Sequence, residues 1–185
     1  MQEAYFGEIQ HGHMEQVGYD TYCKLLDEVV KEMQGIEVQE EQDVQIDINI
    51  SSYIPDSYID SGSQKIEVYQ NIALCRTEED IRNIVDELID RYGEMPNELE
   101  NLLEVARIKE LAKQVNVVKV AQRRESVVFY FDKEKYNPEI VNKLIQKYEF
   151  NIKFSNGIEP YVTLKIRDIT KLVDNIKEFL EFVKE

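Results

Sequence analysis

Tryptophan is absent from this sequence, and histidine and cysteine occur only twice each. Cys23 and Cys75 lie far apart without CxxC spacing, so reduced thiols are expected rather than a disulfide. No apolar run approaches the ~20 residues that cross a membrane. The first residues, Met1–Phe6, also lack a basic region followed by an apolar one, so no secretory signal is expected. These absences predict a cytoplasmic protein that does not contact a membrane.

Glycine is also scarce, with seven residues in the chain. None of them forms a phosphate-cradling GxxxxGK[ST], a dinucleotide-binding GxGxxG or a nucleophile-bearing GxSxG. The sequence therefore predicts no catalytic residue, no cofactor and no enzymatic activity.

Basic residues are outnumbered, because 22 Lys and Arg face 37 Asp and Glu, which gives a net charge of −15. The imbalance is concentrated in residues 1–60, which hold 14 acids and 2 bases. Binding to a phosphate backbone requires Lys or Arg to release counterions. Direct binding to nucleic acid is therefore not expected, and a basic protein partner fits the charge better.

The two histidines, His11 and His13, lie in a short glycine-containing stretch, Gly7–Gly18. A metal-binding or nucleic-acid-binding module using His11 and His13 is the alternative function. A metal site needs a third ligand, for which Glu8 and Glu15 are the local candidates, and the spacing matches no recognisable zinc motif. No metal site is predicted, although a nucleophilic pairing of Cys23 with either histidine stays open at this point.

The clearest periodic segment is Thr77–Tyr92, where apolar residues recur at the spacing of one helical face. Thr77 followed by Asp80 is close to a capping box, Gly93 supplies a stop, and Pro96 opens the next helix. The residues predicted to form the buried stripe are Ile81, Ile84, Val85, Leu88, Ile89 and Tyr92.

The opposite face of this helix carries three acids, Asp86, Glu87 and Asp90. These acids are the candidate partner-binding surface. The simpler interpretation is a solvated face, which any surface helix shows opposite its apolar stripe.

The remaining pattern predicts an α+β fold, with a helical half packed on a small, mainly antiparallel sheet and an N-terminal helical arm. A strand is expected over Val44–Ile50, and an ordered loop follows it. The two helices flanking Thr77–Tyr92 are expected from Ser63 and from Pro96–Asn97. From Val118 onward the pattern predicts the order ββαββα. It places Phe150 in a strand and Ile145 on a buried helix face. The predicted divisions are residues 1–35 (arm), 36–62 (acidic connector with one strand) and 63–185 (α+β domain).

Two stretches resemble one family. Gly7–Val30, GEIQHGHMEQVGYDTYCKLLDEVV, resembles the end of the translocation motif and the following helix in bacterial transcription-repair coupling factors (Mfd). Ser52–Ala112, with the pieces YIPDSYI, IEVYQNIA, ELIDRYGEMP and LLEVARIK, is similar to the C-terminal regulatory domain of the same family.

This resemblance implies a role in nucleotide-excision repair as a regulatory piece of an ATP-dependent DNA translocase whose motor is not in this chain. It implies an intramolecular partner, the UvrA-binding module of the full-length protein, and through it an indirect link to UvrA and RNA polymerase. The contact residues carry over to Glu87 and Asp90 through the match to ELIDRYG. Gln10, Gly12 and His13 correspond to the tail of the translocation motif and would couple to the motor.

Overall fold

The computed structural model describes residues 44–185, which form two compact units. Unit 1 contains Ile50–Ala106, and unit 2 combines residues 44–49 with Arg107–Glu185. Unit 1 is helical and unit 2 contains a five-stranded mixed sheet, so the predicted α+β class is confirmed. The predicted boundaries after residues 35 and 62 stay predictions. Within residues 44–185, no helix is long and apolar enough to cross a membrane.

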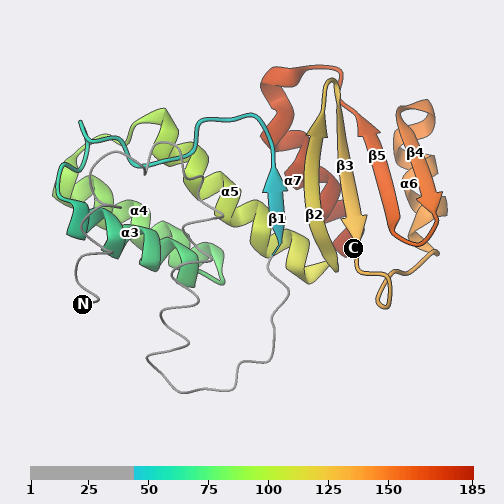
Figure 1. The fold of residues 1–185 in the computed structure, drawn as a ribbon, viewed down its shortest axis with the longest axis horizontal. Helices are drawn as coiled ribbons and strands as arrows, with labels where there is room; N and C mark the ends of the chain where they lie inside the picture. Colours follow the sequence, from blue (N-terminus) through green and yellow to red (C-terminus); the bar gives the residue numbers. More distant parts are fainter. Residues whose placement is uncertain (1–43) are drawn as a thin grey trace, which may run out of the picture. The chain divides into compact units, whose positions relative to one another are not determined.

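Unit 1 is built from α3 (Gly62–Leu74), α4 (Glu78–Tyr92) and the first part of α5 (Asn97–Gln114) (Figure 1). The sequence predicted all three helices, and the structure confirms their order, their approximate starts and the end of α4. The buried face of α3 includes a charged residue, Lys65, which the apolar pattern did not identify. Lys65 pairs with Asp56, so the buried ammonium group has the charged partner that burial requires.

The loop at residues 51–61, here the connecting loop, is fixed to all three helices of unit 1. The backbone N–H of Ile54 donates to the Tyr69 hydroxyl of α3 at 2.9 Å. The N–H of Tyr53 donates to the carbonyl of Glu98 in α5 at 3.2 Å. Ile54 and Ile59 of this loop are buried. Because these bonds satisfy its backbone groups, the loop packs as an ordered part of the core.

Unit 2 contains the predicted ββαββα order. The sheet consists of β1 (Gln45–Asp47), β2 (Val117–Arg123), β3 (Ser126–Phe131), β4 (Ile152–Asn156) and β5 (Pro160–Lys165), in the order β1-β2-β3-β5-β4. Only the β1–β2 pair is parallel. The predicted strand at Val44–Ile50 is therefore present but only three residues long, and it joins the sheet at one edge.

One face of the sheet is covered by α6 (Ile140–Tyr148) and α7 (Leu172–Lys184), which Figure 1 shows on the same side. The ring of Phe129 in β3 stacks on Phe179 in α7, with centroids 3.9 Å apart. Tyr148 of α6 lies 5.9 Å from the same Phe179 ring. The aromatic cluster therefore joins both helices to the central strand, and its burial supplies much of the core of unit 2.

Two expectations for unit 2 are wrong. Phe150 lies in a short 3-10 turn, Glu149–Asn151, before β4 rather than in a strand, and it is 98% exposed. Ile145 lies on α6 as predicted, but it is 46% exposed rather than buried. The periodicity of apolar residues gave the correct element at Ile145 but did not show how far the apolar face extends past the covered area.

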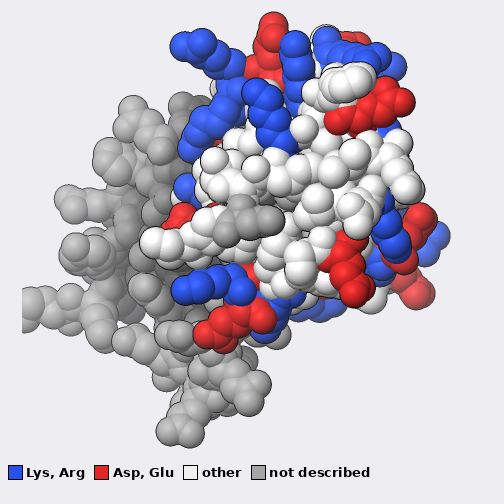
Figure 2. Space-filling model, turned by 90° about the vertical axis from the view of Figure 1, so that its right-hand side faces the viewer, with Lys and Arg blue, Asp and Glu red and all other residues white. Residues whose placement is uncertain are grey.

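Figure 2 views the molecule from the side of Figure 1 on which β4 and α6 are drawn. Uncharged side chains occupy the middle of this face, and the charged side chains gather around its rim. Between residues 140 and 159, the segment of α6, β4 and the turn to β5, the exposed large apolar side chains are Ile145, Phe150 and Ile158.

We expect Phe179→Ala to lower the free energy of unfolding by about 3–5 kcal/mol, because it removes a fully buried ring from the stack on Phe129. Phe150→Ala, which changes the same residue type at an exposed site, should alter stability by less than about 0.5 kcal/mol. Urea unfolding followed by circular dichroism measures both. Equal losses in the two variants would contradict the assigned core.

Candidate interaction surface

The start of α4 is fixed by a capping box. The backbone N–H of Asp80 donates to Thr77 Oγ1 at 3.1 Å, and the N–H of Thr77 donates to Asp80 Oδ2 at 2.8 Å. The N–H of Arg76 also donates to Asp80 Oδ2, at 3.0 Å. These bonds satisfy donors that a helix start otherwise leaves unpaired. They stabilise the ionised carboxylate, led by the bond from Arg76, and so hold the pKa of Asp80 below its ordinary value.

The end of α4 is fixed by Tyr58 from the connecting loop. Its hydroxyl oxygen lies 3.1 Å from the Leu88 carbonyl oxygen and 3.0 Å from the Gly93 carbonyl oxygen. Gly93 adopts a φ of +86°, which a residue with a side chain would find strained, so the predicted stop is confirmed. Partial burial, together with the neighbouring Tyr92, raises the pKa of Tyr58, which stays a neutral donor.

Three exposed acids lie on α4 between these fixed ends, Asp86, Glu87 and Asp90. At ~100° per residue, the three positions lie within an arc of about 100° on the helix surface. They therefore share one side of α4. We call Asp86, Glu87, Asp90 and the neighbouring Ile89 the α4 surface.

One of the three acids already has a cationic partner. Arg91 Nη1 lies 2.7 Å from Glu87 Oε1, in an i,i+4 pair on the same helix. The Arg91 guanidinium also lies 5.1 Å from the centroid of the Tyr92 ring, which holds it on this flank. Among the described residues, Asp86 and Asp90 make no ion pair. The α4 surface thus presents two unpaired carboxylates and one that is partly neutralised.

Ile89 corrects the sequence interpretation, which placed it in the buried stripe. Only Ile81 and Leu88 of that stripe are buried, whereas Ile89 is 48% exposed. On the helix, Ile89 lies beside Asp86, about 60° away. The apolar stripe is therefore wider than the face that unit 1 covers, and its uncovered margin belongs to the α4 surface.

Sequence reasoning identified the three acids but missed Ile89 and Arg91 as parts of the same surface. A signal for Arg91 was present, because Glu87 and Arg91 have the i,i+4 spacing of a helical ion pair. No such signal identified Ile89, because it recurs at the same helical spacing as the apolar residues that are buried.

Several predicted site residues lie outside the described residues: Gln10, His11, Gly12, His13 and Cys23. The role of Gln10, Gly12 and His13 in motor coupling stays a prediction, as does the alternative use of the histidines. Within residues 44–185, no group of three or more His, Cys, Asp or Glu side chains is arranged to hold a metal ion.

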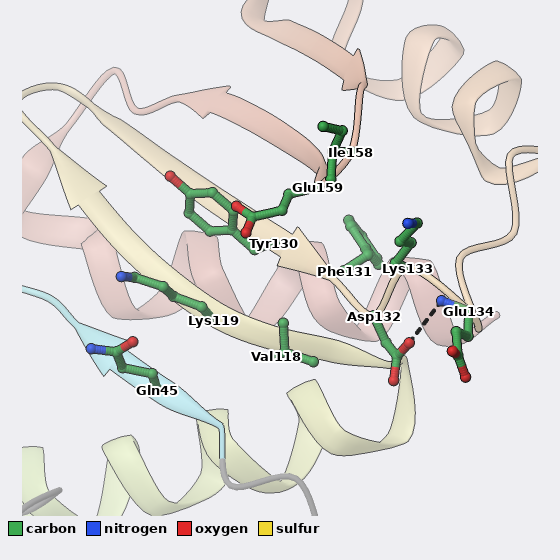
Figure 3. A pocket seen from close by; sticks show the side chains of 10 residues that line it. All are labelled: Gln45, Val118, Lys119, Tyr130, Phe131, Asp132, Lys133, Glu134, Ile158 and Glu159. Carbon is green, nitrogen blue, oxygen red and sulfur yellow. Dashed lines mark hydrogen bonds between the residues drawn. The ribbon is translucent and has the colours of Figure 1, made fainter.

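A second candidate site is a hollow of about 930 Å³ in unit 2, on the sheet face opposite α7 (Figure 3). Its floor includes Tyr130, and Lys119 Nζ lies 5.8 Å from the centroid of that ring. In Figure 3 the Glu159 carboxylate lies near the Tyr130 ring, on the side away from Lys119. The lining includes two lysines, Lys119 and Lys133, and three carboxylates, Asp132, Glu134 and Glu159.

Comparison with known proteins gives the family. The model described as the TRCF domain matches residues 48–141, just over half of the chain. The chain belongs to the TRCF-domain family. The matched segment contains α3, α4 and α5, so the α4 surface lies inside the TRCF domain.

The curated relatives that match this chain are described as transcription-repair-coupling factors. The transcription-repair-coupling factor of Bacillus subtilis is 38% identical over 122 residues, covering 65% of this chain and 10% of the relative. That of Borreliella burgdorferi is 30% identical over 166 residues, covering 89% of this chain and 15% of the relative. The chain thus spans about a tenth of the length of the first curated relatives that it matches.

A solved structure described as the C-terminal domain of transcription-repair coupling factor has the same fold, with a TM-score of 0.67. It is 22% identical and the match covers 76% of this chain and 91% of that chain. The TRCF domain identified here is therefore similar to the C-terminal piece of such factors.

The two units carry opposite charge. Residues 50–106 hold 13 acids and 4 bases, a net of −9, whereas residues 44–49 and 107–185 together hold 13 acids and 16 bases, a net of +3. The α4 surface lies in the acidic unit. Its three acids therefore act within a larger negative field, which raises the local concentration of a basic partner.

We expect the capping box to make stability depend on acid pH. Because the folded pKa of Asp80 is depressed, its contribution is present above the ordinary value of 3.8 and is lost as pH falls through the lower folded pKa. Asp80→Asn should reduce stability at neutral pH and remove this part of the acid-induced loss. Urea unfolding from neutral pH to about pH 3 measures it.

The control is Glu79→Gln, which removes a neighbouring first-turn carboxylate but leaves the box intact. It should keep the acid dependence of the original chain. An Asp80→Asn variant whose stability falls with acid as steeply as the original would show that the box does not carry the effect.

Proposed function

We propose that this chain is a non-catalytic regulatory domain that docks through the α4 surface onto the UvrA-binding module of the same full-length protein. In the docked state it masks that module and restrains the DNA translocase motor. The chain itself carries out no reaction and holds no cofactor, and it reaches UvrA and RNA polymerase only indirectly.

The observation that carries the proposal is the position of Asp86, Glu87 and Asp90. They are exposed side by side on a helix whose two ends are fixed by hydrogen bonds. A helix capped at both ends presents its carboxylates with little backbone ordering at the moment of docking, so the remaining cost is that of the side chains. Membership of the TRCF-domain family supplies the context in which such a surface meets a neighbouring module.

The energetics suit a contact that must open. An exposed ion pair contributes ~0–1 kcal/mol, so two or three pairs, with Ile89 at their margin, give a contact of a few kcal/mol. Differences of this size move a two-state equilibrium substantially without locking it. Binding through such pairs weakens as salt rises, because exposed charges are screened.

The direct test is charge reversal on the α4 surface. Glu87→Lys with Asp90→Lys should weaken binding of this chain to the separately prepared UvrA-binding module by about tenfold or more, since two attractions become repulsions. Titration calorimetry at low and at moderate salt measures the change. The original chain should lose affinity with salt, and the double variant should not.

A matched control is Asp60→Lys with Glu100→Lys, which changes the net charge equally at two exposed positions outside α4. It should reduce affinity much less. If both double variants lose the same affinity, net charge explains the binding and the α4 surface is wrongly assigned.

The Glu87–Arg91 pair generates a prediction of the opposite sign. Arg91→Gln removes the cation that partly neutralises Glu87, so we expect affinity for the UvrA-binding module to rise about two- to fivefold. Stability should change little, because the pair is exposed. Unchanged or weaker binding by Arg91→Gln would mean that Glu87 does not face the partner.

A further inference from the structure

The strand registers of unit 2 place two tyrosines and three lysines on the sheet face that α6 and α7 do not cover. Lys119 of β2 lies opposite Tyr130 of β3, which in turn lies opposite Tyr161 of β5. Directly opposed residues point to the same face, so all three share the face that holds the hollow (Figure 3). Lys165 lies four residues after Tyr161, and Lys153 lies two residues from the β4 partner of Tyr161, so both share it too. We call these five residues the open sheet face.

The two tyrosines lie side by side in the interior of the sheet. Their ring centroids are 5.6 Å apart, and β3 and β5 each have a strand on both sides. Tyr161 is 36% exposed, although its strand is not an edge strand. Aromatic side chains on strands offer flat contact area at a low cost in conformational entropy. This pair therefore favours a ligand that carries flat rings of its own.

The lysines of the open sheet face have no acidic partners among the described residues. Within residues 44–185, Lys119, Lys153 and Lys165 form no ion pair. The five strands contain one carboxylate, Asp47, and it already pairs with Arg123 of the same sheet at 3.0 Å. Three ammonium groups around two aromatic rings favour a ligand that is also anionic.

A ligand for this face has to supply flat rings and negative charges together. A single strand of nucleic acid does so, because each residue carries one base and one phosphate, and proteins bind such strands with aromatic platforms on a basic surface. A duplex keeps its bases stacked on one another, and an acidic peptide supplies the charge without the rings. We propose that the open sheet face binds a short single strand of nucleic acid, with neighbouring bases on Tyr130 and Tyr161 and phosphates at the three lysines.

This inference departs from the expectation drawn from the net charge of the whole chain. The charge of −15 is concentrated in residues 1–60 and in unit 1, whereas the described part of unit 2 carries +3. At 0.1 M salt a charge acts over only about 10 Å, so the charges near a face decide what it binds. The inference is independent of docking through the α4 surface, because it concerns a different unit and different residues.

Carboxylates at one end of the hollow define where the phosphates cannot lie. Glu159 is exposed and lies near the Tyr130 ring (Figure 3). Asp132 and Glu134 line the same hollow beside a single further lysine, Lys133. Phosphates are repelled from this end, so the strand should follow the lysines instead. Glu159→Gln should therefore strengthen binding about twofold.

The experiment is a titration of the full chain into a fluorescent oligothymidylate of about ten nucleotides, followed by anisotropy at ~0.1 M salt. We expect a Kd between about 1 and 100 µM, and a slope of log K against log salt near about −2 for three phosphate contacts. The duplex of the same length should bind about fivefold more weakly or less, since its bases cannot reach the rings. An oligouridylate of equal length is measured beside it, and the tighter of the two strands shows whether the face prefers DNA or RNA.

Matched variants separate the rings from the charges. Tyr161→Ser should lower affinity about five- to hundredfold, whereas Tyr161→Phe should keep it within about twofold, because stacking uses the ring and not the hydroxyl. Lys165→Gln should weaken binding and reduce the salt slope by about 0.7. The control is Lys143→Gln, which makes the same change at an exposed position of α6, on the other side of the sheet, and should alter neither quantity.

A chain that binds no single strand at up to ~1 mM overturns this inference. So does a Tyr161→Ser variant with unchanged affinity, or an equal loss in Lys165→Gln and Lys143→Gln. Polyglutamate that displaces the oligonucleotide at equal charge would also overturn it, because the face would then recognise charge alone. None of these results bears on binding to the UvrA-binding module, which is measured separately with the α4 variants.

Discussion

The single proton of the Tyr58 hydroxyl, shared between the carbonyl oxygens of Leu88 and Gly93, is the constraint on which unit 1 depends. It sets where α4 ends and holds the connecting loop against that end. The capping box does the same at the other end of the helix. Because both ends are capped, fraying of α4 is disfavoured, and the helix backbone holds the carboxylates between its ends on one side.

The two units differ in net charge. Unit 1 is strongly acidic and presents carboxylates beside a partly exposed isoleucine, which suits a basic partner and a contact sensitive to salt. Unit 2 is net basic.

Particular residues show how far the sequence could be interpreted. The periodicity of Thr77–Tyr92, with Thr77, Asp80 and Gly93 at its ends, predicted α4 and both caps because these signals are local. The alternation in the last part predicted β2 to β5 for the same reason. Phe150, Ile145 and Ile89 were assigned to the core wrongly, because apolar character shows what a residue can bury and not what lies beside it.

The sequence by itself determined the order and type of the elements, the caps of α4 and the acidic side of that helix, all of which arise from residues within a few positions of one another. Only the tertiary structure decided that β1 pairs in parallel with β2, that Tyr58 reaches Leu88, and that Lys65 is buried beside Asp56. It also decided which apolar residues stay uncovered. These features depend on contacts between distant segments, and no local pattern encodes which distant surface a residue will meet.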